Sequence, residues 1–181
     1  MARRDVTGVL LLGGASRRFG SPKALATLDG ETLAERAHRT LAATFDTVLA
    51  IGKASDELPL PFPVRDDGSD LRAPIVGVVA ALRLSPTDLC VVVPTDMPLV
   101  SGDLLVALAD SADGVDAAVV ATGPLPGAYR DSARPVLERR IASGELALHR
   151  ALEELESRVL EWDSAELANV NTAEELARVL T

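Results

Sequence analysis

The sequence has few aromatic residues, a single cysteine and no long apolar run, and each shortage excludes a class of protein. Cys90 has no second cysteine with which to form an internal disulfide, and its apolar neighbours favour a small buried side chain over a catalytic thiol. No apolar run is long enough to span a membrane, and the opening residues lack the apolar stretch of a secretion signal. We therefore expect a cytoplasmic protein with no membrane partner.

Basic residues are also scarce, with 18 Lys and Arg against 27 Asp and Glu and a formal net charge of −9. Nucleic acids are bound by basic surfaces, so this balance argues against a nucleic-acid partner. The chain has 181 residues, of which 48% are hydrophobic, and it can bury one substantial aliphatic core. We expect a single domain over residues 1–181.

The most informative segment is LLLGGASRRFGSPK at residues 10–23, where an apolar run meets a glycine-rich, basic loop. Residues 6–12 are typical of a strand buried on both faces of a parallel sheet. Gly13 and Gly14 let backbone N–H groups come close to a ligand. Further polar groups follow in the same loop: a hydroxyl at Ser16 and cations at Arg17, Arg18 and Lys23. This combination predicts phosphate binding, and a strand-to-helix turn with solvated arginines is the alternative.

The spacing of this loop differs from two common phosphate-binding motifs. A Walker loop places lysine and Ser/Thr directly after its second glycine, whereas Gly20 is followed by Ser-Pro-Lys, and no G-x-G-x-x-G is present. Both a P-loop ATPase and a dinucleotide oxidoreductase are therefore disfavoured.

Apolar patterning predicts an alternation of strands and helices. The expected strands are 6–12, 47–51, 88–93 and 115–120, with a short edge strand at 62–65; the expected helices are 31–44, 74–84 and 102–110. Beyond residue 123 the pattern is less regular, with helices expected at 138–141, 146–155 and 172–180 and a strand at 158–162. We predict an α/β fold: a three-layer, mostly parallel, Rossmann-like sheet with helices on both faces.

In an open parallel sheet, ligands bind beyond the carboxyl ends of the strands, so the residues that follow residues 6–12 and 88–93 should converge. Asp96 follows the second of these strands after Pro94 and Thr95. A carboxylate placed there next to phosphates is a natural ligand for magnesium. The alternative is that Asp96 forms an Asp-Met-Pro turn.

The loop closely resembles the L-A-G-G-x-S-x-R-M-G-x-x-K loop of the molybdenum cofactor guanylyltransferases, within the wider nucleotidyltransferase group. Four polar or glycine positions match directly: Ser16, Arg18, Gly20 and Lys23. The resemblance spans nearly the whole chain and continues at residues 66–82, at PTDMPL (94–99), at LPGAYR (125–130) and at NVNTAEEL (169–176).

The resemblance implies a fold of the nucleotide-diphospho-sugar transferase type, with residues 1–122 binding nucleotide and residues 123–181 binding the acceptor. It implies Mg²⁺ as cofactor, held by Asp96. The implied catalytic residues are Lys23, Arg18 and Asp96. The implied nucleotide-binding residues are Leu12, Gly13, Gly14, Ser16, Lys23, Asp66 and Asp96. Counting back from Pro74 makes Asp66 the stronger match, whereas a solvated acidic loop explains Asp67 and Asp70 nearly as well.

The same resemblance implies acceptor contacts at Tyr129, Arg130 and Asn171. Scattered surface arginines and a helix cap are the alternatives for the last two. The implied reaction joins GTP and molybdopterin, releases pyrophosphate and forms molybdopterin guanine dinucleotide. Rival functions are a CTP-dependent molybdopterin cytidylyltransferase, a sugar-phosphate nucleotidyltransferase and a non-catalytic nucleotide-binding accessory protein.

Overall fold

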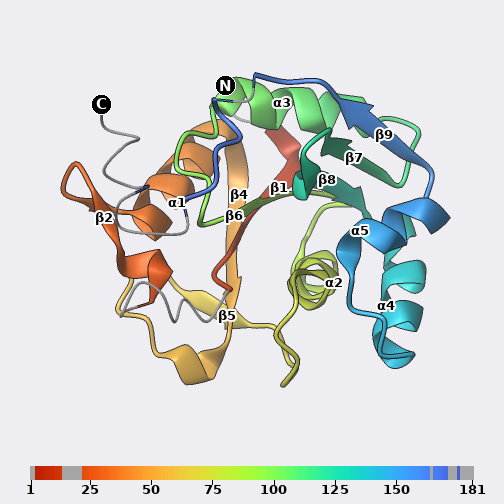
Figure 1. The fold of residues 1–181 in the computed structure, drawn as a ribbon, viewed down its shortest axis with the longest axis horizontal. Coiled ribbons are helices and arrows are strands. Elements are labelled where there is room, and N and C mark those ends of the chain that lie inside the picture. The colour runs from red at the N-terminus through yellow and green to blue at the C-terminus, as the bar shows by residue number, and fades with distance from the viewer. Residues whose placement is uncertain (1–2, 14–21, 164, 171–174, 176–181) are drawn as a thin grey trace.

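A seven-stranded β-sheet forms the centre of the structure, a computed structural model that describes residues 3–13, 22–163, 165–170 and 175 (Figure 1). The strands lie in the order β5-β4-β1-β6-β8-β7-β9. Their bounds are β1 (Arg3–Leu11), β4 (Phe45–Gly52), β5 (Val64–Asp66), β6 (Leu89–Pro94), β7 (Ala117–Val120), β8 (Gly123–Arg130) and β9 (Ser157–Leu160). A separate antiparallel hairpin pairs β2 (Thr27–Leu28) with β3 (Glu31–Thr32).

One half of the sheet is parallel throughout. Leu10 of β1 is in register with Ala50 of β4 on one side and with Val93 of β6 on the other. β5 extends this half at the edge and is parallel to β4, close to the short edge strand predicted at 62–65. The central strand β6 is buried on both faces from Leu89 to Val93, which explains why these residues are a continuous apolar run.

The other half is mixed, because β8 runs antiparallel to both β6 and β7 whereas β9 is parallel to β7. The sequence analysis did not predict β8, since its two prolines and two glycines are typical of a turn. Only Gly127 to Arg130 pair with β6, so both prolines lie outside that ladder and no missing N–H interrupts it.

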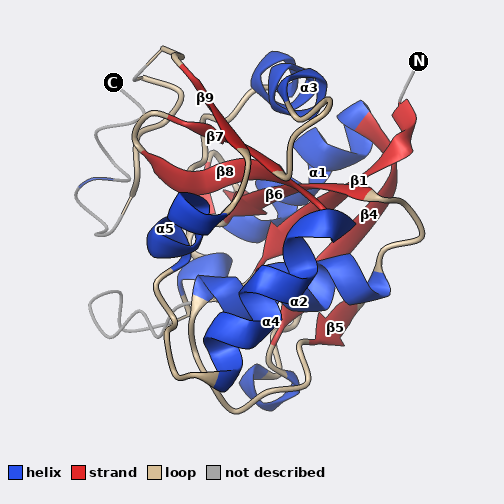
Figure 2. Ribbon diagram, turned by 90° about the vertical axis from the view of Figure 1, so that its right-hand side faces the viewer, coloured by secondary structure: helices blue, strands red, loops and turns tan. Residues whose placement is uncertain are grey.

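Helices cover both faces of the sheet (Figure 2). One face carries α1 (Leu33–Thr44) and α3 (Gly102–Ser111); the other carries α2 (Pro74–Leu84), α4 (Arg134–Ala142) and α5 (Leu148–Ala151). The buried residues accordingly form two main apolar clusters, one on each face. This arrangement confirms the predicted α/β, three-layer, mostly parallel fold.

Local sequence explains where the helices begin. Thr32 and Glu35 form a capping box at the start of α1, in which each side chain accepts a hydrogen bond from the backbone N–H of the other residue. The Ser101 hydroxyl caps α3 by accepting a hydrogen bond from the Leu104 N–H. Pro74 occupies the first turn of α2, where its missing N–H costs nothing. The observed bounds of α2 are those predicted.

The carboxyl-terminal third matches the prediction in part. The single helix expected over 146–155 is instead α5 followed by a short 3₁₀ helix, η4 (Leu152–Glu154). The other 3₁₀ helices are η1 (Lys23–Leu25), η2 (Ala54–Asp56) and η3 (Asp131–Ala133). The strand expected at 158–162 is β9, and the helix expected at 172–180 lies outside the described residues apart from residue 175. None of the helices in the described part of the chain has the length and apolar character needed to cross a membrane.

Candidate active site

A pocket of about 320 Å³ opens at the carboxyl ends of the parallel strands. Gly13 enters it from the end of β1, Lys53 from the end of β4, and Pro74 from the start of α2. Leu11, Leu12 and Ile51 line an apolar part of the same pocket. Open α/β sheets bind ligands at this position, where several loops converge. The pocket is therefore the first element of the candidate site.

Two glycines shape this pocket. A Cβ atom added to Gly13 would have no atom of the described residues within 4 Å apart from its neighbours in the chain, so on that side the backbone is open to a ligand. A Cβ atom added to Gly77 would lie 2.8 Å from the Leu11 Cδ2 atom. Glycine at 77 thus lets α2 pack closely against β1. The Leu12 side chain is buried, and its N–H donates a hydrogen bond to the Ile51 carbonyl oxygen at 2.8 Å, which fixes the end of β1 beside β4.

A cation and a carboxylate meet at the same edge of the sheet. Lys23, the first residue of η1, places its Nζ atom 3.3 Å from the Asp96 Oδ2 atom. The Lys23 side chain is 12% exposed and the Asp96 side chain is 30% exposed, so the carboxylate remains open to solvent. Asp96 lies just beyond the carboxyl end of β6, whose last residue, Pro94, lines the pocket. The structure thus brings together two predicted site residues that are 73 positions apart in the sequence.

A second, more buried ion pair holds one wall of the pocket. The Lys53 Nζ atom donates hydrogen bonds to the Asp67 Oδ1 atom at 2.7 Å and to the carbonyl oxygens of Ser69 and Leu71, both at 2.6 Å. An ammonium group has three donors, so these bonds use all of them. Lys53 therefore fixes the loop at 67–71 against the end of β4 and has no spare donor for a phosphate.

Asp67, rather than the predicted Asp66, lines the pocket. The two oxygens of the Asp66 carboxylate accept hydrogen bonds from the backbone N–H groups of Ala54 at 2.6 Å and Gly68 at 2.7 Å. These bonds hold the pKa of Asp66 below its ordinary value. Asp66 therefore tightens a turn beside the pocket, whereas the carboxylate that lines the pocket is that of the next residue, Asp67.

The donor chemistry at Asp96 fits magnesium. Among the described residues, no group of three or more His, Cys, Asp or Glu side chains is arranged to hold a metal ion. Mg²⁺ does not require such a group, because it is usually held by one or two carboxylates together with substrate phosphates and water. Asp96 offers a single, partly exposed carboxylate just beyond the strand whose last residue, Pro94, lines the pocket, and this arrangement meets that requirement.

Comparison with known proteins agrees with this geometry. The family model of the MobA-like NTP transferase domain matches residues 8–159, most of the chain. The chain belongs to the MobA-like NTP transferase family. It is 32% identical over 176 residues to the molybdenum cofactor guanylyltransferase of Pseudomonas syringae pv. syringae, and the match covers 91% of this chain and 88% of that protein. The protein is accordingly a nucleotidyltransferase.

Solved structures extend the comparison. The molybdopterin-guanine dinucleotide biosynthesis protein A of Archaeoglobus fulgidus superposes on this MobA-like transferase with a TM-score of 0.82 at 25% identity, covering 96% of each chain. The 2-C-methyl-D-erythritol 4-phosphate cytidylyltransferase of Thermus thermophilus superposes with a TM-score of 0.73 at 18% identity, covering 99% of this chain and 97% of that one. The second similarity concerns the fold alone.

Two predicted acceptor residues of the MobA-like transferase lie away from the pocket. Tyr129 is completely buried, and its hydroxyl donates a hydrogen bond to the Pro124 carbonyl at 2.6 Å, so its side chain cannot contact a substrate. Arg130 pairs with Leu89 at the amino end of β6, the end opposite to Asp96. Its guanidinium bonds to Asp88 at 3.2 Å. Burial thus contradicts the predicted contact of Tyr129, and Arg130 lies at the opposite end of the strands from Asp96, because both belong to β8, a strand that was not predicted and runs antiparallel to β6.

Some predicted site residues lie outside the described part of the MobA-like transferase: Gly14, Ser16, Arg18 and Asn171. Conversely, the sequence analysis missed Lys53, although it directly follows β4, just as Gly13 and Asp96 follow their strands. The same rule about strand ends could have found it. Leu125 of β8 also lines the pocket and brings the carboxyl-terminal half of the chain into the site.

Proposed function

We propose that this enzyme transfers GMP from GTP to molybdopterin, releasing pyrophosphate and forming molybdopterin guanine dinucleotide. The observation that carries the proposal is the ion pair between Lys23 and Asp96 at the carboxyl ends of the parallel strands, where the pocket also opens. The Lys23 Nζ atom lies 3.3 Å from the Asp96 Oδ2 atom. The names of relatives such as the Pseudomonas syringae protein support the choice of substrates.

Lys23 and Asp96 are the proposed catalytic pair. In the reaction, a phosphate oxygen of the acceptor attacks the α-phosphorus of GTP as the bond to the pyrophosphate oxygen breaks. The attacking phosphate is already anionic, so no side chain has to remove a proton. The Lys23 ammonium stabilises the negative charge that develops on the phosphates. Asp96 would hold Mg²⁺, which when bound neutralises phosphate charge.

The pocket is the proposed nucleoside site. Its apolar lining suits the flat faces of a base, and the open backbone at Gly13 and the start of α2 suits the sugar and phosphates. The loop that carries Asp67 forms one wall and is fixed in place by Lys53. Preorganisation of that wall reduces the entropic cost of binding.

Further roles rest on the family resemblance alone. Arg18 is proposed to bind the phosphates together with Lys23, and Gly14 and Ser16 to surround the pyrophosphate with backbone N–H groups. Asn171 is proposed to contact the acceptor. Residues 1–181 are proposed to form one domain, with a nucleotide-binding half at 1–122 and an acceptor half at 123–181.

Titration calorimetry with GTP and CTP, followed by pyrophosphate-release assays with and without molybdopterin, tests the proposal. We expect the enzyme to prefer GTP and to release pyrophosphate only when molybdopterin and Mg²⁺ are both present. A preference for CTP would indicate a cytidylyltransferase, and dependence on a sugar phosphate would replace the acceptor. Tight GTP binding without release in any mixture would indicate an accessory protein.

A further inference from the structure

We infer that Val170 is a positioning residue that sets the spacing of Lys23 and Asp96. This inference rests on the proposed function, because it concerns how the catalytic pair is held in place. Val170 lies at the end of the segment that follows β9. In Figure 1 that segment, drawn in blue, runs back across α3 toward the side of the molecule that carries α1 and β2.

The backbone of Val170 contacts the loop that carries Asp96. The Val170 N–H donates a hydrogen bond to the Asp96 carbonyl oxygen at 2.7 Å. This bond restrains the Asp96 carbonyl group, which is attached directly to the Cα atom that bears the carboxylate side chain. The same loop is held on its other side by Arg36, whose Nε atom donates to the Pro98 carbonyl at 2.9 Å.

The side chain of Val170 packs against the segment that carries Lys23. Val170 is completely buried in a small apolar cluster with Leu28 and Leu33, against which Ala26 also packs. Ala26 in turn donates its N–H to the Lys23 carbonyl at 3.1 Å and accepts from the Leu33 N–H at 2.8 Å. Val170 therefore contacts both segments of the proposed catalytic pair. Its backbone N–H bonds to the loop that carries Asp96, and its side chain packs against the segment that follows Lys23.

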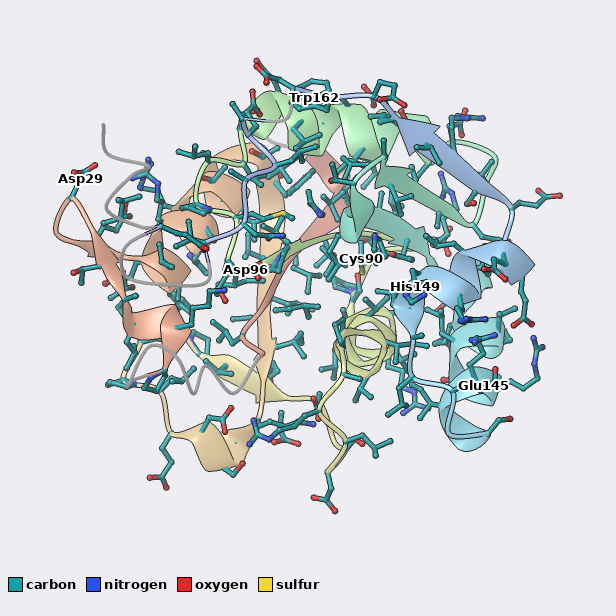
Figure 3. All side chains as sticks on the ribbon, viewed as in Figure 1. Asp29, Cys90, Asp96, Glu145, His149 and Trp162 are labelled. Atoms are coloured by element: carbon teal, nitrogen blue, oxygen red, sulfur yellow. The ribbon has the colours of Figure 1, made fainter. Side chains whose placement is uncertain are left out.

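The segment before Val170 is itself anchored. The Glu166 Oε2 atom accepts hydrogen bonds from the Ser101 hydroxyl at 2.5 Å and from the Trp162 Nε1–H at 3.1 Å. Ser101 is the cap of α3, which follows the Asp96 loop directly. In Figure 3, Trp162 is seen at the top of the view beside α3, and Asp96 is seen near the middle. Glu166 thus limits how far Val170 can move away from the catalytic pair.

The test compares Val170→Ala with Val119→Ala. Val119 is a buried valine of β7, a strand that contributes no residue to the pocket lining, so it matches the change in volume at a position outside the candidate site. GTP affinity is measured by calorimetry in EDTA and in Mg²⁺, and thermal unfolding is followed in parallel. Turnover is measured as pyrophosphate release with molybdopterin.

For Val170→Ala we expect Mg²⁺ to lose about tenfold of its enhancement of GTP affinity, because residues that orient a metal ligand typically have effects of this size. We also expect kcat to fall by about tenfold, because a small misplacement of a catalytic group is enough for such a loss. GTP affinity in EDTA should fall by less than the Mg²⁺ enhancement does, since Val170 does not line the pocket and only the Lys23 contact to the phosphates is disturbed. Val119→Ala should lower the melting temperature and leave the Mg²⁺ enhancement intact, and Val170→Ile should retain it.

Each outcome decides the inference. If Val170→Ala and Val119→Ala behave alike, Val170 only stabilises the fold and the inference is overturned. If Val170→Ala does not fold, Glu166→Ala decides: reduced Mg²⁺ enhancement supports the inference and an unchanged one overturns it. If Mg²⁺ does not enhance GTP binding to the unaltered protein, the proposed function fails and the inference fails with it. A last outcome is that Val170→Ala loses the Mg²⁺ enhancement of GTP affinity but neither the unaltered protein nor any variant releases pyrophosphate. This result supports the inference and overturns only the proposed reaction.

Discussion

Strands β6 and β8 each have a charged residue at or just beyond the carboxyl end, Asp96 and Arg130, yet these two residues lie at opposite ends of the strands. β6 is parallel to β1, so Asp96 emerges beside Gly13 and meets Lys23. β8 is antiparallel to β6, so Arg130 emerges at the amino end of β6 and bonds to Asp88. The difference shows that strand direction decides at which end of the sheet's strands a charged residue emerges, and therefore whether it can reach the pocket.

The strongest test of this difference between the two strand ends compares the Lys23→Ala variant with the Arg130→Ala variant. We expect kcat to fall by about a thousandfold for Lys23→Ala, because a preorganised cation is removed from the phosphates. Arg130→Ala should leave kcat and both KM values unchanged. Pyrophosphate release measures both effects, and circular dichroism checks that each variant is folded. Equal losses in the two variants would mean that strand direction does not separate the site from the remainder of the sheet.

Two ion pairs in the described part of the chain differ strongly in burial. The Lys53 and Asp67 side chains in the parallel half are 11% and 8% exposed, whereas those of Arg83 and Glu138 are 58% and 32% exposed. Lys53→Met should lower the free energy of unfolding by about 3 kcal/mol, because it leaves a buried carboxylate without its partner. It should also weaken GTP binding by loosening the pocket wall.

Arg83→Met is the matched control and should cost less than about 1 kcal/mol, as is typical of exposed pairs. Urea unfolding gives both values. Adding Asp67→Asn to Lys53→Met should restore part of the lost stability, because it removes the unpaired charge. A double variant less stable than Lys53→Met alone would contradict this account of the pair.

Cys90 lies on β6 at the junction of the two halves, in register with Tyr129 of β8. Burial raises the pKa of the Cys90 thiol from 9.0 to about 11. The thiol has a higher pKa in the folded than in the unfolded protein, so its contribution to the free energy of unfolding is complete below pH 9. This contribution is lost as the pH rises toward 11. We expect a loss on the order of 2 kcal/mol, measured as the difference between the unaltered protein and Cys90→Ala in urea unfolding at pH 8 and pH 10.5. Parallel pH profiles would show that the thiol is not shielded by the fold.

The smallest expected effect is that of Tyr129→Phe. Loss of the hydroxyl leaves the Pro124 carbonyl without its 2.6 Å hydrogen bond and should cost about 1 kcal/mol. The KM for molybdopterin should not change, because the ring is completely buried. Thermal unfolding and steady-state kinetics provide the two measurements. An increase in that KM would return Tyr129 to the acceptor site.

The elements that the sequence predicted best are those whose pattern is local. Residues 74–84 are apolar on all sides and begin with proline, and they form α2 with the predicted bounds. Residues 88–93 are a continuous apolar run and form β6, buried on both faces. In contrast, β8 was missed because Pro124 and Pro126 hide its strand character, and those prolines are tolerated only because they lie beyond its pairing with β6.

The site divides in the same way. The strand-end rule correctly predicted that Lys23 and Asp96 would meet, because both follow strands of the parallel half. Whether Asp66 or Asp67 faces the pocket could not be predicted from the sequence, because adjacent residues point to different sides of the chain and only the folded loop decides which carboxylate lines the pocket.

The sequence by itself determined the alternation of strands and helices, the glycine-rich entry to the site and the presence of its main charged groups, because these depend on residue type and local spacing. Tertiary structure decided strand direction, the burial of Tyr129 and the three-way clamp of Lys53. It also brought Val170 from near the end of the chain into contact with the Asp96 loop. These features depend on contacts between residues far apart in the sequence, which only packing of the whole sheet can select.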